Sequence, residues 1–143
     1  MADQDKKELE NVCRNFRRDM ETILSWKWDS RFEMVLAEFP NDRQEDVRTV
    51  LARYLDCGWD HSDIRRAPAV VHKICDEYLG GLRAGQFFFA TNPEKPLFML
   101  GAWWPWGDGK TVSLRLAPFG QNLSETELDE LTREFNDWFG VRP

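Results

Sequence analysis

The chain has 143 residues and carries 25 acidic against 19 basic side chains, a formal net charge of −6 at neutral pH. A hydrophobic content of 42% with 13% aromatic residues excludes an intrinsically disordered chain, and the length is typical of one domain with its own core. The negative charge is unfavourable for binding to nucleic acid and to anionic membranes, which attract cationic surfaces. We therefore expect a single domain, residues 1–143, that binds neither.

The N-terminal residues and the cysteines indicate the compartment. The first ten residues are rich in charge and lack the apolar stretch of a signal peptide. The longest apolar run, residues 97–104, is too short to span a bilayer. Three cysteines, an odd and sparse number, are typical of reduced thiols. These features predict a cytoplasmic protein.

Apolar residues at helical spacing predict four helices in the first part of the chain. The expected helices cover residues 8–28, 30–39, 42–57 and 67–80. The second is short and depends on apolar side chains at i, i+3, i+4 and i+7, which are Phe32, Val35, Leu36 and Phe39. Asp29 or Ser30 can cap the second helix, Pro40 ends it, and Gly58 favours the end of the third.

Three strands are expected next, over residues 86–91, 97–104 and 111–117. The breaks between them contain proline, asparagine and glycine and are too short for a crossover helix, so the strands should form an antiparallel meander. The middle strand is apolar on both faces, which predicts a central position covered on both sides.

The last expected helix covers residues 124–139. Ser124 followed three residues later by Glu127 is a capping box, and the apolar residues after it recur at helical spacing. The predicted fold class is therefore α+β, with about four N-terminal helices, a three-stranded antiparallel meander and a C-terminal helix.

One cluster of residues has the composition of a metal site. Cys57, His61, His72 and Cys75 lie in one short segment, and two Cys with two His can complete a tetrahedral zinc site. However, Cys75 lies on the apolar stripe of its helix, where a cysteine behaves as a small hydrophobic residue. We expect no bound metal, no other cofactor and no catalytic residues, and we keep zinc binding by these four residues as an alternative.

The aromatic residues of the predicted sheet are the candidates for a binding surface. Trp103, Trp104 and Trp106 surround a proline at the end of the middle strand, and Phe88 and Phe98 lie on the strands themselves. Aromatic side chains in loops often anchor a partner, because they offer large area at low entropic cost. A three-stranded sheet with two apolar faces could also leave one face open for association.

These observations favour a non-enzymatic interaction domain that binds a protein partner through the aromatic sheet face and loop. A regulator, a chaperone or an inhibitor of the immunity type would fit, and its partner would be another protein, possibly a basic one, or a second copy of the chain. The alternatives are the zinc-binding domain and a small-molecule pocket lined by aromatic residues.

Overall fold

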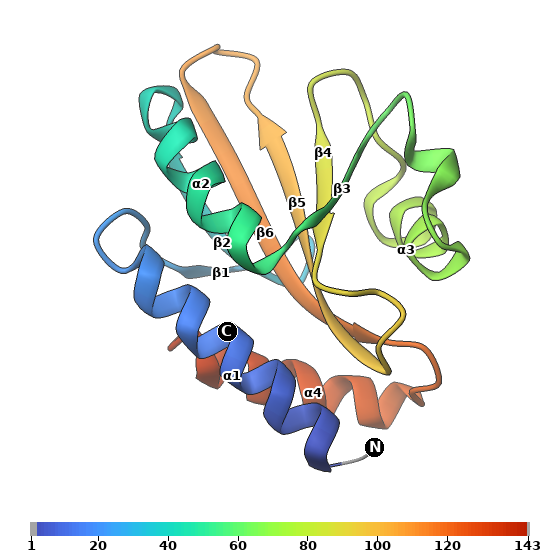
Figure 1. Ribbon diagram of the computed structural model, residues 1–143. Coiled ribbons are helices and arrows are strands. Elements are labelled where there is room, and N and C mark those ends of the chain that lie inside the picture. The colour runs from blue at the N-terminus through green and yellow to red at the C-terminus, as the bar shows by residue number, and fades with distance from the viewer. Residues whose placement is uncertain (1–2, 143) are drawn as a thin grey trace.

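The computed structural model describes residues 3–142, which form four α-helices and a six-stranded sheet (Figure 1). In chain order the elements are α1 (Asp3–Met20), β1 (Lys27–Asp29), β2 (Met34–Pro40), α2 (Gln44–Tyr54), β3 (Cys57–Asp60), α3 (Ala69–Leu79), β4 (Phe87–Ala90), β5 (Leu97–Pro105), β6 (Thr111–Gly120) and α4 (Glu125–Trp138). The expected α+β class is confirmed. Within residues 3–142, none of the helices has the length and apolar character needed to cross a membrane.

The strands lie in the order β1–β2–β6–β5–β4–β3, and every neighbouring pair is antiparallel. Strands β4, β5 and β6 pair in sequence order with β5 in the middle. The predicted sheet of three strands is wrong. The chain adds β2 and β1 beyond β6, and β3 beyond β4.

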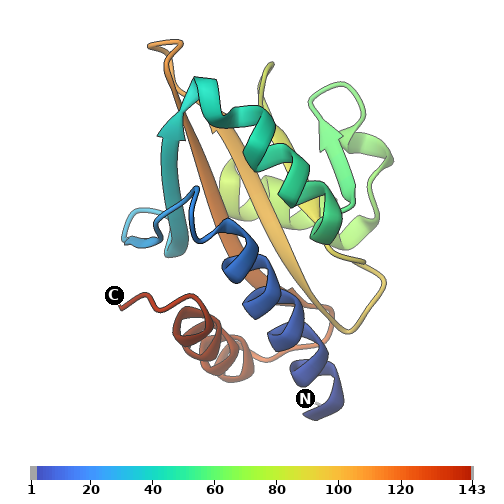
Figure 2. The ribbon, with the colours of Figure 1, turned by 60° about the vertical axis from the view of Figure 1, so that its left-hand side comes forward.

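Helices cover the two faces of this sheet unequally. Figure 2 shows α1 and α2 in front of the sheet and α3 behind it. Buried side chains of α1, α2 and α4 form one large core cluster with alternate residues of β2, β5 and β6, including Val35, Met99 and Leu114. A smaller cluster joins α3 to the opposite face, where Phe98 and Leu100 lie. The expectation that β5 is buried on both faces is therefore confirmed.

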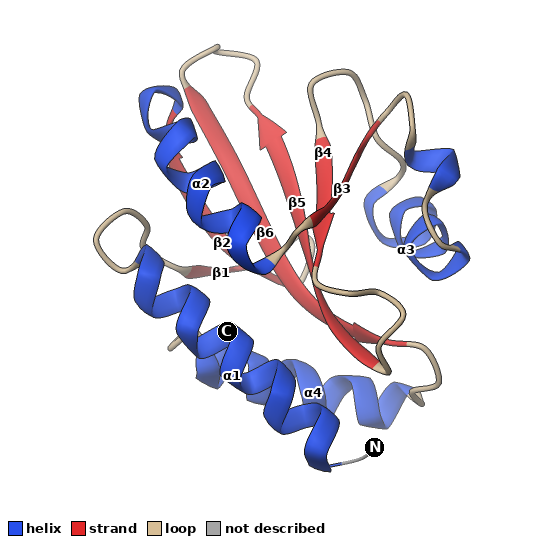
Figure 3. Cartoon of the chain, viewed as in Figure 1, coloured by secondary structure: helices blue, strands red, loops and turns tan. Residues whose placement is uncertain are grey.

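The predicted helix over residues 30–39 is wrong, because residues 34–40 form strand β2 (Figure 3). Its apolar residues have helical spacing, but Met34–Ala37 is also a continuous apolar run, which suits a strand buried on both faces. In β2, Val35 faces the main core and Met34 faces the opposite cluster. Pairing with β6 satisfies the backbone of β2, and this partner lies far away in the sequence.

Other element boundaries also differ from the prediction. The first helix begins earlier and ends at Met20 rather than at residue 28, and Trp28 belongs to β1. Strand β3 was not predicted, because Gly58 reads as a helix stop and the strand has only four residues. The helices predicted over 42–57, 67–80 and 124–139 are confirmed as α2, α3 and α4, each slightly shorter.

The capping box at the start of α4 is confirmed. The Ser124 hydroxyl accepts a hydrogen bond from the Glu127 backbone N–H at 3.2 Å, and the Glu127 carboxylate accepts one from the Ser124 N–H at 3.1 Å. This reciprocal pair satisfies two of the donors that a helix start leaves free.

Replacing Ser124 by alanine should lower the free energy of unfolding by about 1 kcal/mol, because the cap acceptor is lost. Thr126→Ala, an exposed substitution in the first turn of the same helix, is the matched control and should change it by less than about 0.5 kcal/mol. Urea denaturation of the two variants measures the difference. Equal losses would show that the cap does not stabilise α4.

Candidate functional site

A surface groove between the sheet and α4 is the main concave feature of the described residues. Its volume is about 640 Å³, against 210–270 Å³ for four other hollows, and it is open to solvent. Its floor comes from β2 and β6 and includes Met34, Ala117 and Phe119. Phe32, in the turn before β2, and Tyr78, on α3, also line it. We call it the β6–α4 groove.

Helix α4 supplies the polar wall of the groove. One stripe of the helix, including Leu131 and Phe135, is buried in the main core. The neighbouring stripe faces the groove and consists of Glu125, Leu128, Asp129, Thr132, Arg133 and Asn136. These residues recur at intervals of three and four, so the same helical period that packs the core also lines this surface.

The opposite wall is held in place by a nearly buried ion pair. Arg115 of β6 donates from Nε to Asp29 Oδ2 of β1 at 2.6 Å, and the two side chains are only 13% and 11% exposed. The other carboxylate oxygen of Asp29 accepts from the Arg31 backbone N–H at 3.0 Å. Asp29 therefore fixes the β1–β2 turn onto the sheet.

Two aromatic rings complete the surroundings of Arg115. Its guanidinium carbon lies 5.0 Å from the centre of the Phe32 ring and 4.6 Å from that of the Trp104 ring. The two rings themselves meet edge to face at 5.1 Å. Cation–π contacts of this kind strengthen when water is excluded. The turn therefore covers a part of the sheet face next to the part covered by α3.

Asn136 is the least solvated polar residue of the groove wall. The residue lines the groove, yet it is only 4% exposed. Its buried Oδ1 atom has no hydrogen-bond partner among residues 3–142. A buried polar atom without a partner is costly and therefore uncommon.

The aromatic residues predicted as a binding surface divide into two groups. Phe88, Phe98 and Trp103 are buried in the core and offer no surface to a partner. Trp104 is half-buried beside Arg115, and Trp106 is 45% exposed, with its indole N–H donating to the Ser113 hydroxyl at 2.6 Å. Only these last two remain candidates for contact.

Sequence reasoning missed the residues that line the groove. Tyr78 continues the apolar spacing of its helix after Ile74 and Cys75, but it is 50% exposed and packs edge to face on Phe119 at 5.4 Å. The groove-facing stripe of α4 carries one leucine among polar residues, which reads as an ordinary solvated helix face. The chain offers no local pattern that distinguishes it from one.

The candidate metal ligands are not brought together. No group of three His, Cys, Asp or Glu side chains within residues 3–142 is arranged to hold a metal ion. Cys75 is buried beside Phe88 and Ala102, and burial raises its pKa to about 11. His72 instead lies 3.3 Å from Asp76 on the outside of α3. That the protein binds no metal remains a prediction.

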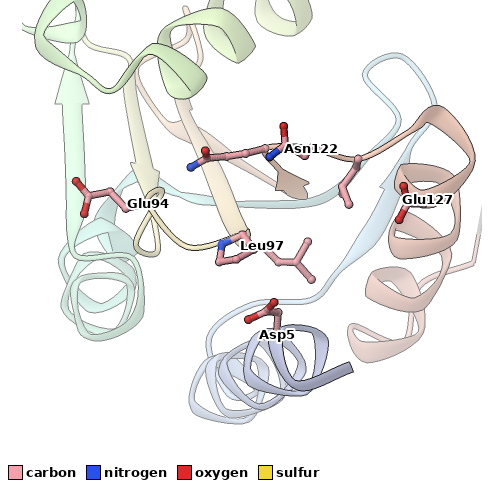
Figure 4. Close-up of a pocket in the computed structure, with 8 residues that line it drawn as sticks. Asp5, Glu94, Leu97, Asn122 and Glu127 are labelled. Carbon is pink, nitrogen blue, oxygen red and sulfur yellow. The ribbon is translucent and has the colours of Figure 1, made fainter. Parts of the chain in front are cut away.

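A second hollow collects carboxylates without forming a site. Figure 4 shows Asp5, Glu94 and Glu127 around it, each on a different part of the chain. Glu127 accepts the capping hydrogen bond described above, so this carboxylate already has a structural role.

Comparison of the chain with protein-family models, with curated proteins and with solved structures finds no match in any of the three.

Replacing Asp29 by asparagine should lower the free energy of unfolding by about 3 kcal/mol, because Arg115 would keep its charge without a counterion. Glu10→Gln is the control. Glu10 accepts from Arg14 Nε at the same 2.6 Å, but those side chains are 34% and 55% exposed, so the loss should be below about 0.5 kcal/mol. Chemical denaturation measures both, and similar losses would show that burial adds nothing to the Asp29–Arg115 pair.

Thiol reactivity should follow burial. Cys57 is half-buried, and burial together with the neighbouring Asp56 raises its pKa, so alkylation near pH 8 should be slower than for a free cysteine. Cys13 and Cys75 are buried and should react only after unfolding. Intact-mass spectrometry during iodoacetamide treatment follows the order, with Cys57→Ser as the control. Early modification of Cys75 would contradict the structure.

Proposed function

We propose that the chain is a non-enzymatic interaction domain that binds another polypeptide through the β6–α4 groove. The observation that carries this proposal is a large open groove in which a half-exposed tyrosine, an apolar floor and a charged helix face occur together. Interfaces typically combine aromatic anchors with a polar rim in this way.

The groove replaces the open sheet face as the proposed surface. The sequence suggested that a whole apolar face would be free, but α3 and the β1–β2 turn cover much of it. What remains accessible is the part between Tyr78, the turn and α4. Because Phe32 contacts Trp104, the half-buried Trp104 adjoins this surface, whereas Trp106 lies on the β5–β6 hairpin.

The chemistry of the groove favours binding rather than catalysis. Its described lining contains no cysteine or histidine, and its carboxylates are spread along a helix and a turn. A covalent mechanism would need a nucleophile with a base in hydrogen-bond reach. Apolar and aromatic side chains beside solvated charges are instead what a peptide segment with mixed character requires.

A small-molecule site is the second candidate, because about 640 Å³ falls within the usual range for ligand pockets. The groove is open rather than enclosed, and this favours a polypeptide that continues past its ends. Native mass spectrometry of the purified chain separates the two, since a retained small molecule adds a discrete mass. A second copy of the chain would double the mass.

Tyr78→Ala should abolish capture of the partner or weaken it about ten-fold or more, because an aromatic anchor would be lost. Trp106→Ala removes an aromatic side chain of similar exposure, 45% against 50%, outside the groove and should leave capture unchanged. Affinity purification with quantitative mass spectrometry from cells that express each variant compares them. Circular dichroism checks that both remain folded.

The reverse result would overturn the choice of surface. If Trp106→Ala prevents capture and Tyr78→Ala does not, the partner binds the hairpin aromatics instead of the groove. Light scattering over a range of concentrations shows whether the partner is a second copy, in which case Tyr78→Ala should reduce self-association.

A further inference from the structure

The rim of the β6–α4 groove is negatively charged. Glu33 in the turn and Glu125 and Asp129 on α4 are exposed, and Arg133 is the cationic side chain in the described lining. None of these three carboxylates forms an ion pair with any residue in the range 3–142. Arg133 lies one helical turn from Asp129, so the described lining has three carboxylates against one guanidinium and remains negative. The net charge of the whole chain, −6, adds to the negative electrostatic potential at the groove.

The base of the groove is apolar. Met34, Ala117 and Phe119 lie on it, and Leu128 adds an aliphatic side chain from α4. Tyr78 packs on Phe119 with half of its surface exposed, so its ring, rather than the buried floor residues beneath it, offers apolar surface for contact. A small polar cation would leave the apolar side chains of the groove in contact with water. The ligand therefore needs apolar groups as well as positive charge.

Asn136 adds a requirement for a hydrogen bond. Its Oδ1 is buried and has no partner, while the residue lines the groove. Rotation about the last side-chain bond exchanges the amide oxygen and nitrogen, so the oxygen can be turned to accept from a donor in the groove while the NH2 group takes the buried position. Ammonium, guanidinium and backbone N–H groups all supply such a donor.

From these three features we infer that the groove binds a basic amphipathic segment of a partner protein, with apolar residues on the floor and lysine or arginine between the acidic rim and Asn136. This inference rests on the proposed function and names its ligand. Acidic segments are disfavoured by repulsion from Glu33, Glu125 and Asp129.

Three synthetic peptides of equal length test the chemistry. One alternates leucine and lysine in an amphipathic pattern, the second has glutamate in place of lysine, and the third has serine in place of leucine. Fluorescence anisotropy of labelled peptides should show binding of the leucine–lysine peptide, with weaker or no binding of the other two. Equal binding of the lysine and glutamate peptides would overturn the role of charge, and equal binding of the leucine and serine peptides would overturn that of the floor.

Two neighbouring positions of α4 provide a matched pair of variants. Asp129→Lys should lower the affinity for the leucine–lysine peptide by about three-fold or more, since a rim carboxylate is replaced by a cation. The dependence of this affinity on salt concentration should also become weaker. Glu130→Lys makes the same change of charge on the next residue, which is exposed but does not line the groove, and should have little effect. Equal effects would mean that net charge, not the groove, attracts the peptide.

Asn136→Leu separates binding from folding. It removes the unpaired oxygen with little change in volume, so the stability should stay the same or increase, while peptide affinity should fall by about five-fold. Asn122→Leu, an exposed asparagine outside the groove, should change neither. If Asn136→Leu leaves peptide affinity intact, the amide does not contact the ligand and its part in the inference fails.

The peptide assay and the capture experiment fail in different ways. If capture depends on Tyr78 but the leucine–lysine peptide does not bind, the domain is an interaction module and the inferred ligand chemistry is wrong. If neither depends on the groove, the proposed function itself is wrong.

Discussion

Burial of both faces of β5 and β6 is the constraint on which the rest of the structure depends. Met99 and Leu114 face α1, α2 and α4, whereas Phe98 and Leu100 face α3. Gly101, which follows Leu100 in β5, allows close approach, since a Cβ at this position would lie 3.3 Å from Leu55. A sheet that is apolar on both sides must be covered on both sides, so the chain divides its helices between two layers.

The unequal division of the helices produces the groove. Three helices cover one face and one covers the other, so the second face also needs the β1–β2 turn to complete its cover. The nearly buried Asp29–Arg115 pair fixes that turn, although this removes two charges from most of their water. Between the turn and α4, the cover stops short of a closed layer, and the β6–α4 groove remains.

The elements that could be predicted from the sequence are those whose stabilising contacts lie close together in the chain. The meander and α4 were predictable, because short connections and the capping box at Ser124 lie within a few residues. Strand β2 and the Asp29–Arg115 pair were not, because their partners are distant in sequence. The density of tryptophan and phenylalanine pointed to Trp103 and Phe98, which are core residues. The groove combines parts of α3, α4, two strands and a turn, and this combination exists only after folding.

The two edges of the sheet are unusually poor places for another strand to join. The outermost strands, β1 and β3, have three and four residues, and β1 carries the exposed Lys27. Short, charged edges offer few free backbone donors and acceptors in register, which discourages end-to-end polymerisation of sheets and amyloid-like growth. A polypeptide that attaches here by backbone pairing alone would gain only a brief ladder. A partner of the proposed kind would therefore have to be recognised through side chains, and so through its sequence.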